Sequence, residues 1–400
     1  MAGNIVVTGI GIVSAIGLDV QQTFDSLVNK KTGIAPLTIL DTVHKDEFVM
    51  GEIKLSNNEL VEKAEVDAKK SWTRTALLGI IAAKQAVADA GLSAKELKKA
   101  GLISASTVGG MDRSELYYKD FLKGGHQEFI DMHHAGDSTE KIAETIGIKG
   151  FLSTVSTACS SSLNSQILGV KMLKSGLLEQ VIVGGTDALS RFTLNGFNTL
   201  MILDRKHCRP FDATRTGLNL GEGAAFLVLE TEESAKKAGR KIYATLAGYG
   251  NANDANHQTA TSDEGDGPFL SMQKALKVAG IKPDDTDYIN VHGTGTENND
   301  LTEGKAIKRL FGNNVPPFSS TKAFTGHTLG AAGVIESVFS ILTLQHQVMF
   351  PNVNFKTAIP EINLTPVTEV QHKKINYVMT NSFGFGGNDS SVVFGKAPEM

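Results

Sequence analysis

Cysteine is scarce in this chain, and neither sign of charge is in clear excess. Only two cysteines, Cys159 and Cys208, occur in 400 residues, and their positions show no metal-ligand spacing. A secreted domain built on disulfides is therefore excluded, and no metal site is expected. Lys and Arg number 39 against 43 Asp and Glu, a net charge of −4. This balance gives no indication of nucleic acid or an anionic membrane surface as a partner.

Long uncharged apolar runs and a leader sequence are missing as well. Charged residues recur too often to leave a transmembrane run of about 18 apolar residues. The first residues carry no basic segment and soon break into Gly-rich turns, unlike a signal peptide. We therefore expect a cytoplasmic protein without a membrane span. The chain is long enough to form a large core in two or three structural units.

Short apolar segments that end in Gly alternate with long segments of helical periodicity. In the first part of the chain the strand-like segments are residues 5–9, 102–104, 181–185 and 225–229. Residues 76–90 carry apolar side chains at helical spacing. Apolar runs without alternation are typical of strands covered on both faces, and strands that alternate with helices form layered folds. The sequence thus predicts a layered α/β protein.

A charged stretch, residues 230–241, separates two regions of similar pattern. After it the alternation restarts, with strands at 243–248, 288–292 and 390–394 and helices at 268–279 and 330–345. We interpret the charged stretch as a solvated surface helix at the boundary between two halves, residues 1–235 and 236–400. The similar order of strands in the two halves is a faint indication of duplication.

The sequence around Cys159 indicates a reactive cysteine and not one that only packs in the core. Residues 153–162 read as a strand that runs into a turn, and a helical pattern follows, so Cys159 lies at or just before a helix N-terminus. Backbone N–H groups there favour a thiolate, which can accept an acyl group as a thioester. Small neighbouring residues leave room for that group. A buried, inert cysteine is the alternative, and that structural role is the one we expect for Cys208.

Two histidines lie in turns that are rich in Gly and Thr. His292 ends a predicted strand, and His327 lies in the turn before the predicted helix at 330–345. Strand ends in open α/β sheets are common positions for functional sites. A lone histidine is more often structural, but two histidines in such similar settings favour catalysis. Neutral imidazole can donate a hydrogen bond to a developing oxyanion or enolate.

Lys322 and a Gly-rich segment complete the candidate set. Lys322 lies five residues before His327 among small and apolar residues, so if buried it needs an acidic partner. Glu336 and Glu303 are the candidates for this partner. The Gly-rich segment at 381–389 can aim a backbone N–H at an oxyanion. A phosphate cradle is the weaker alternative, because no P-loop Lys-Ser/Thr follows and the segment runs into a strand.

Taken in order, these segments resemble the β-ketoacyl-acyl carrier protein synthases, the elongating condensing enzymes with the thiolase-like fold. The match covers nearly the whole chain. It rests on residues 6–9, 157–160, 209–212, 221–224, 292–296, 322–333 and 383–387. The resemblance implies two similar α/β halves stacked as five layers, αβαβα. The cysteine would belong to the half at 1–235, and the histidines, the lysine and the Gly-rich loop to the half at 236–400.

The resemblance also implies a ping-pong reaction. Cys159 would accept an acyl chain from acyl carrier protein, after which malonyl-acyl carrier protein would enter and lose CO₂. The resulting enolate would attack the Cys159 thioester and give a 3-oxoacyl chain two carbons longer. His292 and His327 would stabilise the malonyl thioester oxygen during decarboxylation, and whether one of them also acts as a base stays open. No cofactor is implied, because the phosphopantetheine of the carrier holds the substrates.

The same resemblance implies roles for four further residues near the cysteine. The backbone N–H groups of Cys159 and Phe385 would form an oxyanion hole, and the Phe385 ring would gate access to the cysteine. Lys322 would set the electric field around the histidines. Glu336 would hold this lysine, with Glu303 as a second candidate partner.

Substrate contacts and one departure from the family also follow from the resemblance. Thr294 and Thr296 would contact the phosphopantetheine arm. Val108 matches a position that lines the acyl pocket, although simple packing is the alternative. The final loop of the family often reads Gly-Gly-Thr-Asn, whereas this chain has Asn388 and Asp389 after the glycines. Loop mobility or substrate preference would differ as a result.

The implied partner is acyl carrier protein. Its acidic surface would meet basic residues, for which the candidates are Lys69, Lys70 and Arg74 and the pair Arg205 and Lys206. A solvated face without a partner is the equal alternative for these residues. Family members are homodimers, so a twofold dimer is expected, and a heterodimer with a subunit like a chain-length factor stays open.

Three other functions are compatible with parts of this pattern. A thiolase would carry a second catalytic cysteine in the C-terminal Gly-rich loop, where this chain has Phe385. A non-catalytic chain-length partner would usually have lost the cysteine or a histidine. A Cys-His acyl hydrolase needs one histidine base and access for water, so two separate histidine turns and Lys322 fit it poorly. The acyl chain, whether of a fatty acid, a polyene or an aromatic-capped chain, is not determined by the sequence.

Overall fold

The structure, a computed structural model, describes residues 3–398. Within that range ten strands form one mixed sheet; they are β1 Ile5–Ser14, β4 Gly101–Ala105, β5 Leu152–Val155, β6 Gln180–Asp187, β7 Gly223–Thr231, β8 Ala244–Asn253, β9 Tyr288–Asn290, β10 Phe318–Ser319, β13 Tyr377–Gly384 and β14 Asn388–Lys396. Their order across the sheet is β10-β9-β13-β14-β8-β1-β7-β6-β4-β5. Two small antiparallel sheets of two strands each lie outside it, one of β2 (Ile34–Pro36) with β3 (Val49–Gly51) and one of β11 (Val348–Met349) with β12 (Gln371–His372).

The two halves of the sheet have the same topology. Counted within its own half, the third strand lies at the edge, and the second, fourth, fifth and first strands follow toward the middle. In both halves the three edge strands run parallel, and the two inner pairings are antiparallel. The halves meet where Val6 and Val7 of β1 pair with Thr245 and Ala244 of β8. This shared order supports the duplication that the sequence indicated only faintly.

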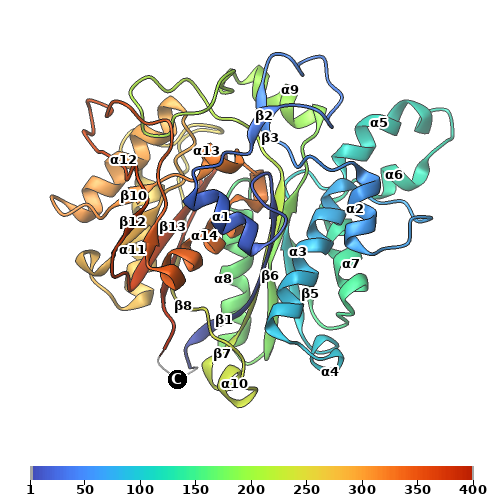
Figure 1. The fold of residues 1–400 in the computed structure, drawn as a ribbon, viewed down its shortest axis with the longest axis horizontal. Helices are drawn as coiled ribbons and strands as arrows, with labels where there is room; N and C mark the ends of the chain where they lie inside the picture. Colours follow the sequence, from blue (N-terminus) through green and yellow to red (C-terminus); the bar gives the residue numbers. More distant parts are fainter. Residues whose placement is uncertain (1–2, 399–400) are drawn as a thin grey trace.

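Helices cover the sheet on its outer faces and fill the space between the halves (Figure 1). Helices α8 (Ser161–Lys174) and α14 (Ala332–His346) lie in the middle, α3 (Arg74–Ala90) covers the first half, and α11 (Asp266–Ala279) with α12 (Glu297–Phe311) covers the second. Three apolar cores match this arrangement, because one contains side chains of α8 and α14, a second those of α3, and a third those of α11 and α12. The expected αβαβα layering is therefore present.

The remaining helices are short or peripheral. They are α1 Val20–Val28, α2 Asn57–Ala64, α4 Ala94–Leu97, α5 Met111–Phe121, α6 Gln127–Asp131, α7 Ala135–Ile146, α9 Arg191–Thr199, α10 Glu232–Lys237 and α13 Lys322–Thr325, with 3₁₀ turns at Pro283–Asp285 and Leu329–Ala331. Helix α10 lies within the charged stretch at 230–241. The prediction of a solvated stretch holds for only part of it. Glu230, the first residue of the stretch, belongs to β7 and is fully buried. It forms an ion pair with Arg240 inside the protein.

Each outer helix packs closely on the first strand of its half because glycine lies at the contact. A Cβ atom added to Gly11 of β1 would fall 1.9 Å from the Ala82 carbonyl oxygen of α3. A Cβ atom on Gly250 of β8 would fall 2.0 Å from the Ser271 carbonyl oxygen of α11. No side chain fits at such distances, so both glycines are needed for this close approach.

One helical segment of the described chain, Leu329–His346, is long and apolar enough to span a membrane by length and composition alone. The sequence prediction, which expected no such run, missed it, although Glu336 is the only Asp, Glu, Lys or Arg in the segment. In the structure 89% of the segment is buried. It belongs to the layer between the two sheet halves, which is the position of a core helix.

Candidate active site

Cys159 lies in the turn that links β5 to α8. Ala158 has a φ of +51°, a left-handed conformation that costs energy in a residue other than glycine. The turn is fixed locally, since the Ser161 hydroxyl donates to the Ala158 carbonyl and accepts from the Thr157 N–H. The sulfur is thus presented just ahead of the helix N-terminus, as predicted, and the residue is only 6% exposed.

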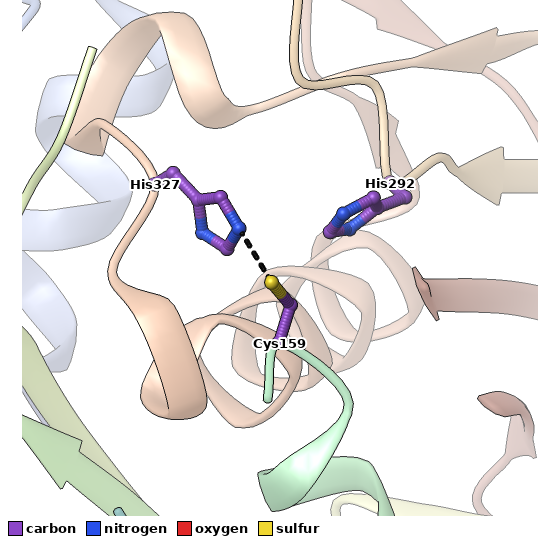
Figure 2. Close-up of side chains that lie close together, drawn as sticks. All are labelled: Cys159, His292 and His327. Atoms are coloured by element: carbon purple, nitrogen blue, oxygen red, sulfur yellow. Dashed lines mark hydrogen bonds between the residues drawn. The ribbon is translucent and has the colours of Figure 1, made fainter. Parts of the chain in front are cut away.

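His292 and His327 meet Cys159 from two other segments. Figure 2 shows both imidazoles turned toward the sulfur, His292 from the end of β9 and His327 from the turn before α14. His327 Nε2 lies 3.1 Å from Cys159 Sγ, and the two rings stand 5.4 Å apart, nearly perpendicular to each other. Residues that are far apart in the sequence therefore form one compact cluster.

The proton of each imidazole can be placed from its partners. The Leu329 backbone N–H donates to His327 Nδ1 over 3.2 Å, and the Lys322 ammonium lies 3.3 Å from His292 Nδ1. Both of these groups can only donate, so both Nδ1 atoms accept and the ring proton resides on Nε2. Burial, and then the charge of Lys322, lower the pKa of both histidines well below the ordinary 6.5. Both rings are thus neutral and present an Nε2–H toward the cysteine.

Lys322 is the buried charge next to this pair. It is 1% exposed, and its ammonium donates to Glu336 over 2.5 Å and to the His292 carbonyl over 2.6 Å. Burial raises the pKa of Glu336 to about 7, although the attraction of Lys322 opposes that change. Lys322 is therefore a buried lysine, and Glu336 is its acidic partner.

Glu303 does not pair with Lys322, so the second partner proposed from the sequence is wrong. Its two carboxylate oxygens instead accept the backbone N–H groups of His292 and Gly293, each over 2.8 Å, and Asn381 donates to it as well. Burial raises the pKa of Glu303 to about 7. Glu303 thus fixes the backbone from which the His292 ring projects. Sequence spacing offers no way to tell which of two nearby carboxylates faces an ammonium.

The Cys159 thiol differs from the sequence expectation in its protonation. The helix N-terminus indicated a thiolate, but burial raises the pKa of Cys159 to about 11. The positive charge of Lys322 and the backbone N–H groups of Phe385 and Cys159 lower it only partly. Desolvation of the sulfur outweighs the favourable dipole, so the resting group is a thiol.

Alkylation of Cys159 by iodoacetamide is therefore expected to accelerate steadily from about pH 7 to about pH 10, because only the thiolate reacts. Below its pKa the thiolate fraction rises about tenfold per pH unit. The rate can be followed by mass spectrometry of the peptide that contains Cys159, with Cys208 as the buried reference thiol. A rate that levels off near pH 8 would contradict the raised pKa.

The Gly-rich loop between β13 and β14 covers the sulfur. Gly386 and Gly387 have φ values of +84° and +77°, which bend the loop tightly. The backbone N–H groups of Phe385 and Cys159 lie close enough to the Cys159 thiol to lower its pKa in part, so both are candidate donors to an oxyanion that forms beside the sulfur. The Phe385 ring stacks on Phe197 of α9, with 5.9 Å between the ring centroids. Both rings lie on the wall of a cavity that reaches Cys159.

A cavity of about 370 Å³ leads from the surface to the cluster. Cys159, His292 and His327 lie on its wall together with Thr294 and Thr296. The hydroxyls of the two threonines are 2.8 Å apart and hydrogen-bond to each other. Polar groups along an open channel that ends at a nucleophile suit a long, hydrogen-bonding substrate arm.

Two groups of residues singled out in the sequence lie elsewhere. Val108 is not on the cavity wall but packs in an apolar cluster with Leu189 and Leu329, which favours the packing alternative. Arg74 is 5% exposed and forms an ion pair with Glu222 at 2.7 Å, so it cannot belong to a basic surface. The other basic candidates, Lys69, Lys70, Arg205 and Lys206, are exposed.

Asp187 is a residue of this region that the sequence reading missed. It ends β6, and its buried carboxylate accepts the Gly330 N–H over 2.8 Å and the Thr107 hydroxyl over 2.7 Å. It thereby ties the turn that carries His327 to the first half of the chain. The available signal was an acidic residue at the end of an otherwise apolar strand.

The cluster also has the ligand types of a zinc site, with one sulfur and two imidazole nitrogens within 4.8 Å of one another. The hydrogen-bond partners of the two imidazoles do not fit zinc. A zinc-bound Nε2 requires the proton on Nδ1, usually donated to an acceptor. Here both Nδ1 atoms face donors, the Leu329 N–H and the Lys322 ammonium. The donor set therefore favours hydrogen bonding to an anionic oxygen over binding of a cation.

Comparison with curated proteins gives close relatives along nearly the whole chain. The protein named 3-oxoacyl-[acyl-carrier-protein] synthase 2 of Staphylococcus aureus (strain COL) is 37% identical over 409 residues, covering 98% of each chain. The protein of the same name from Vibrio cholerae serotype O1 is 32% identical over 411 residues, again covering 98% of each.

Solved structures of high similarity include two ketosynthases with chain length factors. The structure titled "The ishigamide ketosynthase/chain length factor" superposes with a TM-score of 0.92 at 29% identity and full coverage of both chains. A chain of the structure titled "Ketosynthase (ApeO) in Complex with its Chain Length Factor (ApeC) from Xenorhabdus doucetiae" gives a TM-score of 0.84 at 30% identity, covering 99% of this chain and 98% of that chain.

Two family profiles account for most of the chain. "Beta-ketoacyl synthase, N-terminal domain" matches residues 2–235, and "Beta-ketoacyl synthase, C-terminal domain" matches residues 243–356. Together with the relatives above, these matches confirm the resemblance and the thiolase-like fold expected from the sequence. The chain belongs to the beta-ketoacyl synthase family.

Proposed function

We propose that this chain is a 3-oxoacyl-[acyl-carrier-protein] synthase, an acyltransferase that joins malonyl-acyl carrier protein to an acyl chain held on Cys159. The observation that carries this proposal is the pair of neutral imidazoles, each with its proton on Nε2, that face the cysteine. Two such donors at one place stabilise a negatively charged oxygen. The relatives whose names include the acyl carrier protein synthase activity support the same conclusion.

In the first stage Cys159 takes the acyl chain. The sulfur attacks the thioester carbonyl of the acyl carrier protein, and the Phe385 and Cys159 N–H groups receive the oxyanion that forms. The bond from the carbonyl carbon to the pantetheine sulfur then breaks. The proton lost from Cys159 ends on that pantetheine thiol, so the stage is balanced without a cofactor.

In the second stage malonyl-acyl carrier protein occupies the channel. The carbon–carbon bond to its carboxylate breaks, CO₂ leaves, and the electron pair moves into an enolate whose oxygen lies between His292 Nε2–H and His327 Nε2–H. The enolate carbon attacks the acyl carbonyl on Cys159, and the sulfur leaves as a thiolate. One proton returns this thiolate to the thiol, which its raised pKa favours.

Lys322 acts through His292. Its ammonium keeps the ring proton on the far nitrogen, and its positive charge disfavours imidazolium, so the donor stays neutral. A role of either histidine as a base toward the Cys159 thiol does not agree with these tautomers, because the nitrogen that faces the sulfur already carries a proton. In this proposal both histidines act as hydrogen-bond donors to oxyanions.

The channel suits an arm delivered by a carrier protein better than free coenzyme A. In the part of the chain that the structure describes, no Lys or Arg lines the cavity, and Glu297 is its one acidic residue. The phosphates of coenzyme A would thus find no basic partner at the mouth. Thr294 and Thr296 would hydrogen-bond the amides of the phosphopantetheine arm. This argument favours the synthase over a thiolase.

Acyl carrier protein is the partner that we propose for the exposed basic residues. Lys69, Lys70 and Lys206 are exposed, and the Arg205 side chain is 71% exposed although it pairs with Glu47. These groups offer positive charge outside the cavity, where an acidic carrier would dock. One related structure is titled as a ketosynthase in complex with its acyl-carrier protein.

We also propose a twofold homodimer in the cytoplasm, with the boundary between the two halves of each chain at 235/236. Some related ketosynthases pair with a chain length factor, so a heterodimer is the second assembly to consider. This chain retains the cysteine and both histidines, which favours a catalytic subunit over a non-catalytic partner. The molar mass of the purified chain by light scattering distinguishes a homodimer from a monomer that awaits another subunit.

The function is tested by incubating the purified chain with acyl-acyl carrier protein and radiolabelled malonyl-acyl carrier protein. We expect CO₂ release coupled one-to-one with formation of a 3-oxoacyl product. A panel of saturated, polyene and aromatic-capped acyl chains then gives the preferred substrate. Acyl hydrolysis without CO₂ release would indicate a hydrolase, and activity with acetyl-coenzyme A alone would indicate a thiolase.

A further inference from the structure

Asp389 is a buried carboxyl group at a place where the family often has asparagine. It is the second residue of β14 and is 2% exposed. Within residues 3–398 its side chain forms no ion pair, and its Oδ2 atom is buried without a hydrogen-bond partner. A Cβ atom on Gly267 of α11 would fall 2.0 Å from this oxygen and 2.6 Å from Asp254 Cβ. Asp254 and Asp389 therefore lie against the same face of Gly267.

The charges that act on Asp389 most strongly are acidic. The segment after β8 contributes Asp254, whose Oδ2 accepts the N–H and hydroxyl of Ser262. Helix α12 contributes Glu303, and the first turn of α11 contributes Asp266, which is paired with Arg309. Burial, and then the charges of Asp254 and Glu303, raise the pKa of Asp389 to about 8.

This group adjoins the loop that carries the Phe385 N–H. The loop and the strand ends beside it, residues 383–389, are joined to the segment 254–262 by two backbone hydrogen bonds, and Asn388 and Asp389 pair with the end of β8 in the sheet. Asp254 N–H donates to the Gly387 carbonyl over 2.7 Å, and Gly386 N–H donates to the Gln258 carbonyl over 2.8 Å. The same two segments thus carry both the backbone contacts and the pair of carboxyl groups, so repulsion between the carboxylates acts directly on the loop.

We propose that Asp389 is a positioning residue that holds residues 383–389 against residues 254–262 while it is protonated, and that its ionisation next to Asp254 separates the two segments and displaces the Phe385 N–H. Repulsion between two buried carboxylates raises the free energy of the closed arrangement more than that of the open arrangement, in which water solvates both groups. The link to catalysis rests on the proposed function, whereas the loop movement does not.

The direction of the pH effect follows from linkage. The closed arrangement binds the Asp389 proton up to about pH 8, and an open, solvated carboxyl would lose it near its ordinary pKa of about 4. Closure is therefore complete at low pH, weakens as the pH rises toward 8, and changes little above that value. A single coupled proton gives a change of at most about tenfold in the closing equilibrium per pH unit.

Hydrogen exchange of the substrate-free protein tests the loop movement. After correction for the intrinsic exchange rate, protection of residues 383–389 and 254–262 is expected to fall by about threefold to tenfold per unit from about pH 6 to about pH 8. It is expected to be constant above that. In Asp389→Asn, which has the same shape without the charge, protection stays constant over the whole range. Superimposable profiles of the two proteins would overturn the proposal.

Two further measurements separate this role from a merely structural one. Asp254→Asn removes the facing charge but leaves Asp389 buried, so the fall in protection is expected to become smaller than in wild type, and this comparison holds even if Asp389→Asn should fold poorly. The rate of Cys159 acylation in wild type is expected to decline relative to Asp389→Asn as the pH rises from about 6 to about 8. A changed exchange profile with no acyl transfer in either protein would retain the loop movement and reject the proposed function.

Discussion

Replacement of Cys159 by alanine is expected to lower the rate of condensation by at least about 10⁴-fold, because no other group can hold the acyl chain. The cavity wall offers one thiol, and the second cysteine of the chain is buried elsewhere. The substitution removes a single sulfur that faces the channel, so the fold is expected to survive. The measurements are product formation from acyl- and malonyl-acyl carrier protein, together with circular dichroism and thermal unfolding.

Cys208→Ala provides the matched control for this variant. Cys208 is also buried, at 1% exposure, and it packs near Gly295 without contact to His292 or His327. The same chemical deletion at this position is expected to change the rate of elongation by less than about threefold. If Cys159→Ala elongates as fast as Cys208→Ala, Cys159 is not the nucleophile.

Loss of either imidazole is expected to impair decarboxylation of malonyl-acyl carrier protein more than acylation of Cys159. His292→Ala and His327→Ala each remove one of the two Nε2–H donors that would face the enolate oxygen. Removal of one such donor costs about 10²- to 10³-fold in rate. In the proposed mechanism acylation uses the Phe385 and Cys159 N–H groups instead, so it is expected to fall much less.

The two activities can be measured separately. Release of labelled CO₂ reports decarboxylation, and mass spectrometry of the intact protein reports the acyl group on Cys159. His257→Ala is the control, because His257 lines the same cavity but lies outside the cluster. We expect it to affect both activities equally and weakly. Equal losses in the His292 and His327 variants, or a greater loss of acylation, would overturn the assignment of the enolate to the imidazole pair.

Much of the site could be predicted because its residues lie at ends of regular elements. Cys159 precedes a helix, and His292 follows a strand, so local periodicity was enough to mark them as candidates. The fold class followed from the alternation of apolar strands with helices. The location of the three side chains in one cluster depends on the packing of two halves against each other, which only the resemblance to a family indicated.

The errors have a common physical cause, which is that burial is not visible in local sequence. Arg74 looks like part of a basic surface, yet its guanidinium is enclosed with Glu222. The helix N-terminus next to Cys159 was recognised, but the desolvation that raises its pKa was not. Glu303 has the spacing of a lysine partner and instead accepts two backbone N–H groups. For all three residues, segments that are distant in the sequence determine the burial and the charge partners, and these determine the protonation state and the contacts.

The repeated strand order has a consequence for how the reaction centre arises during synthesis. The nucleophile belongs to the half that leaves the ribosome first, whereas the imidazoles, the ammonium and the Phe385 amide are all translated later. Among residues 3–398 two residue pairs join the halves in the sheet, and α14 packs beside α8 between them. A nascent first half therefore carries a thiol without its catalytic apparatus, and acyl transfer begins only when the chain is whole.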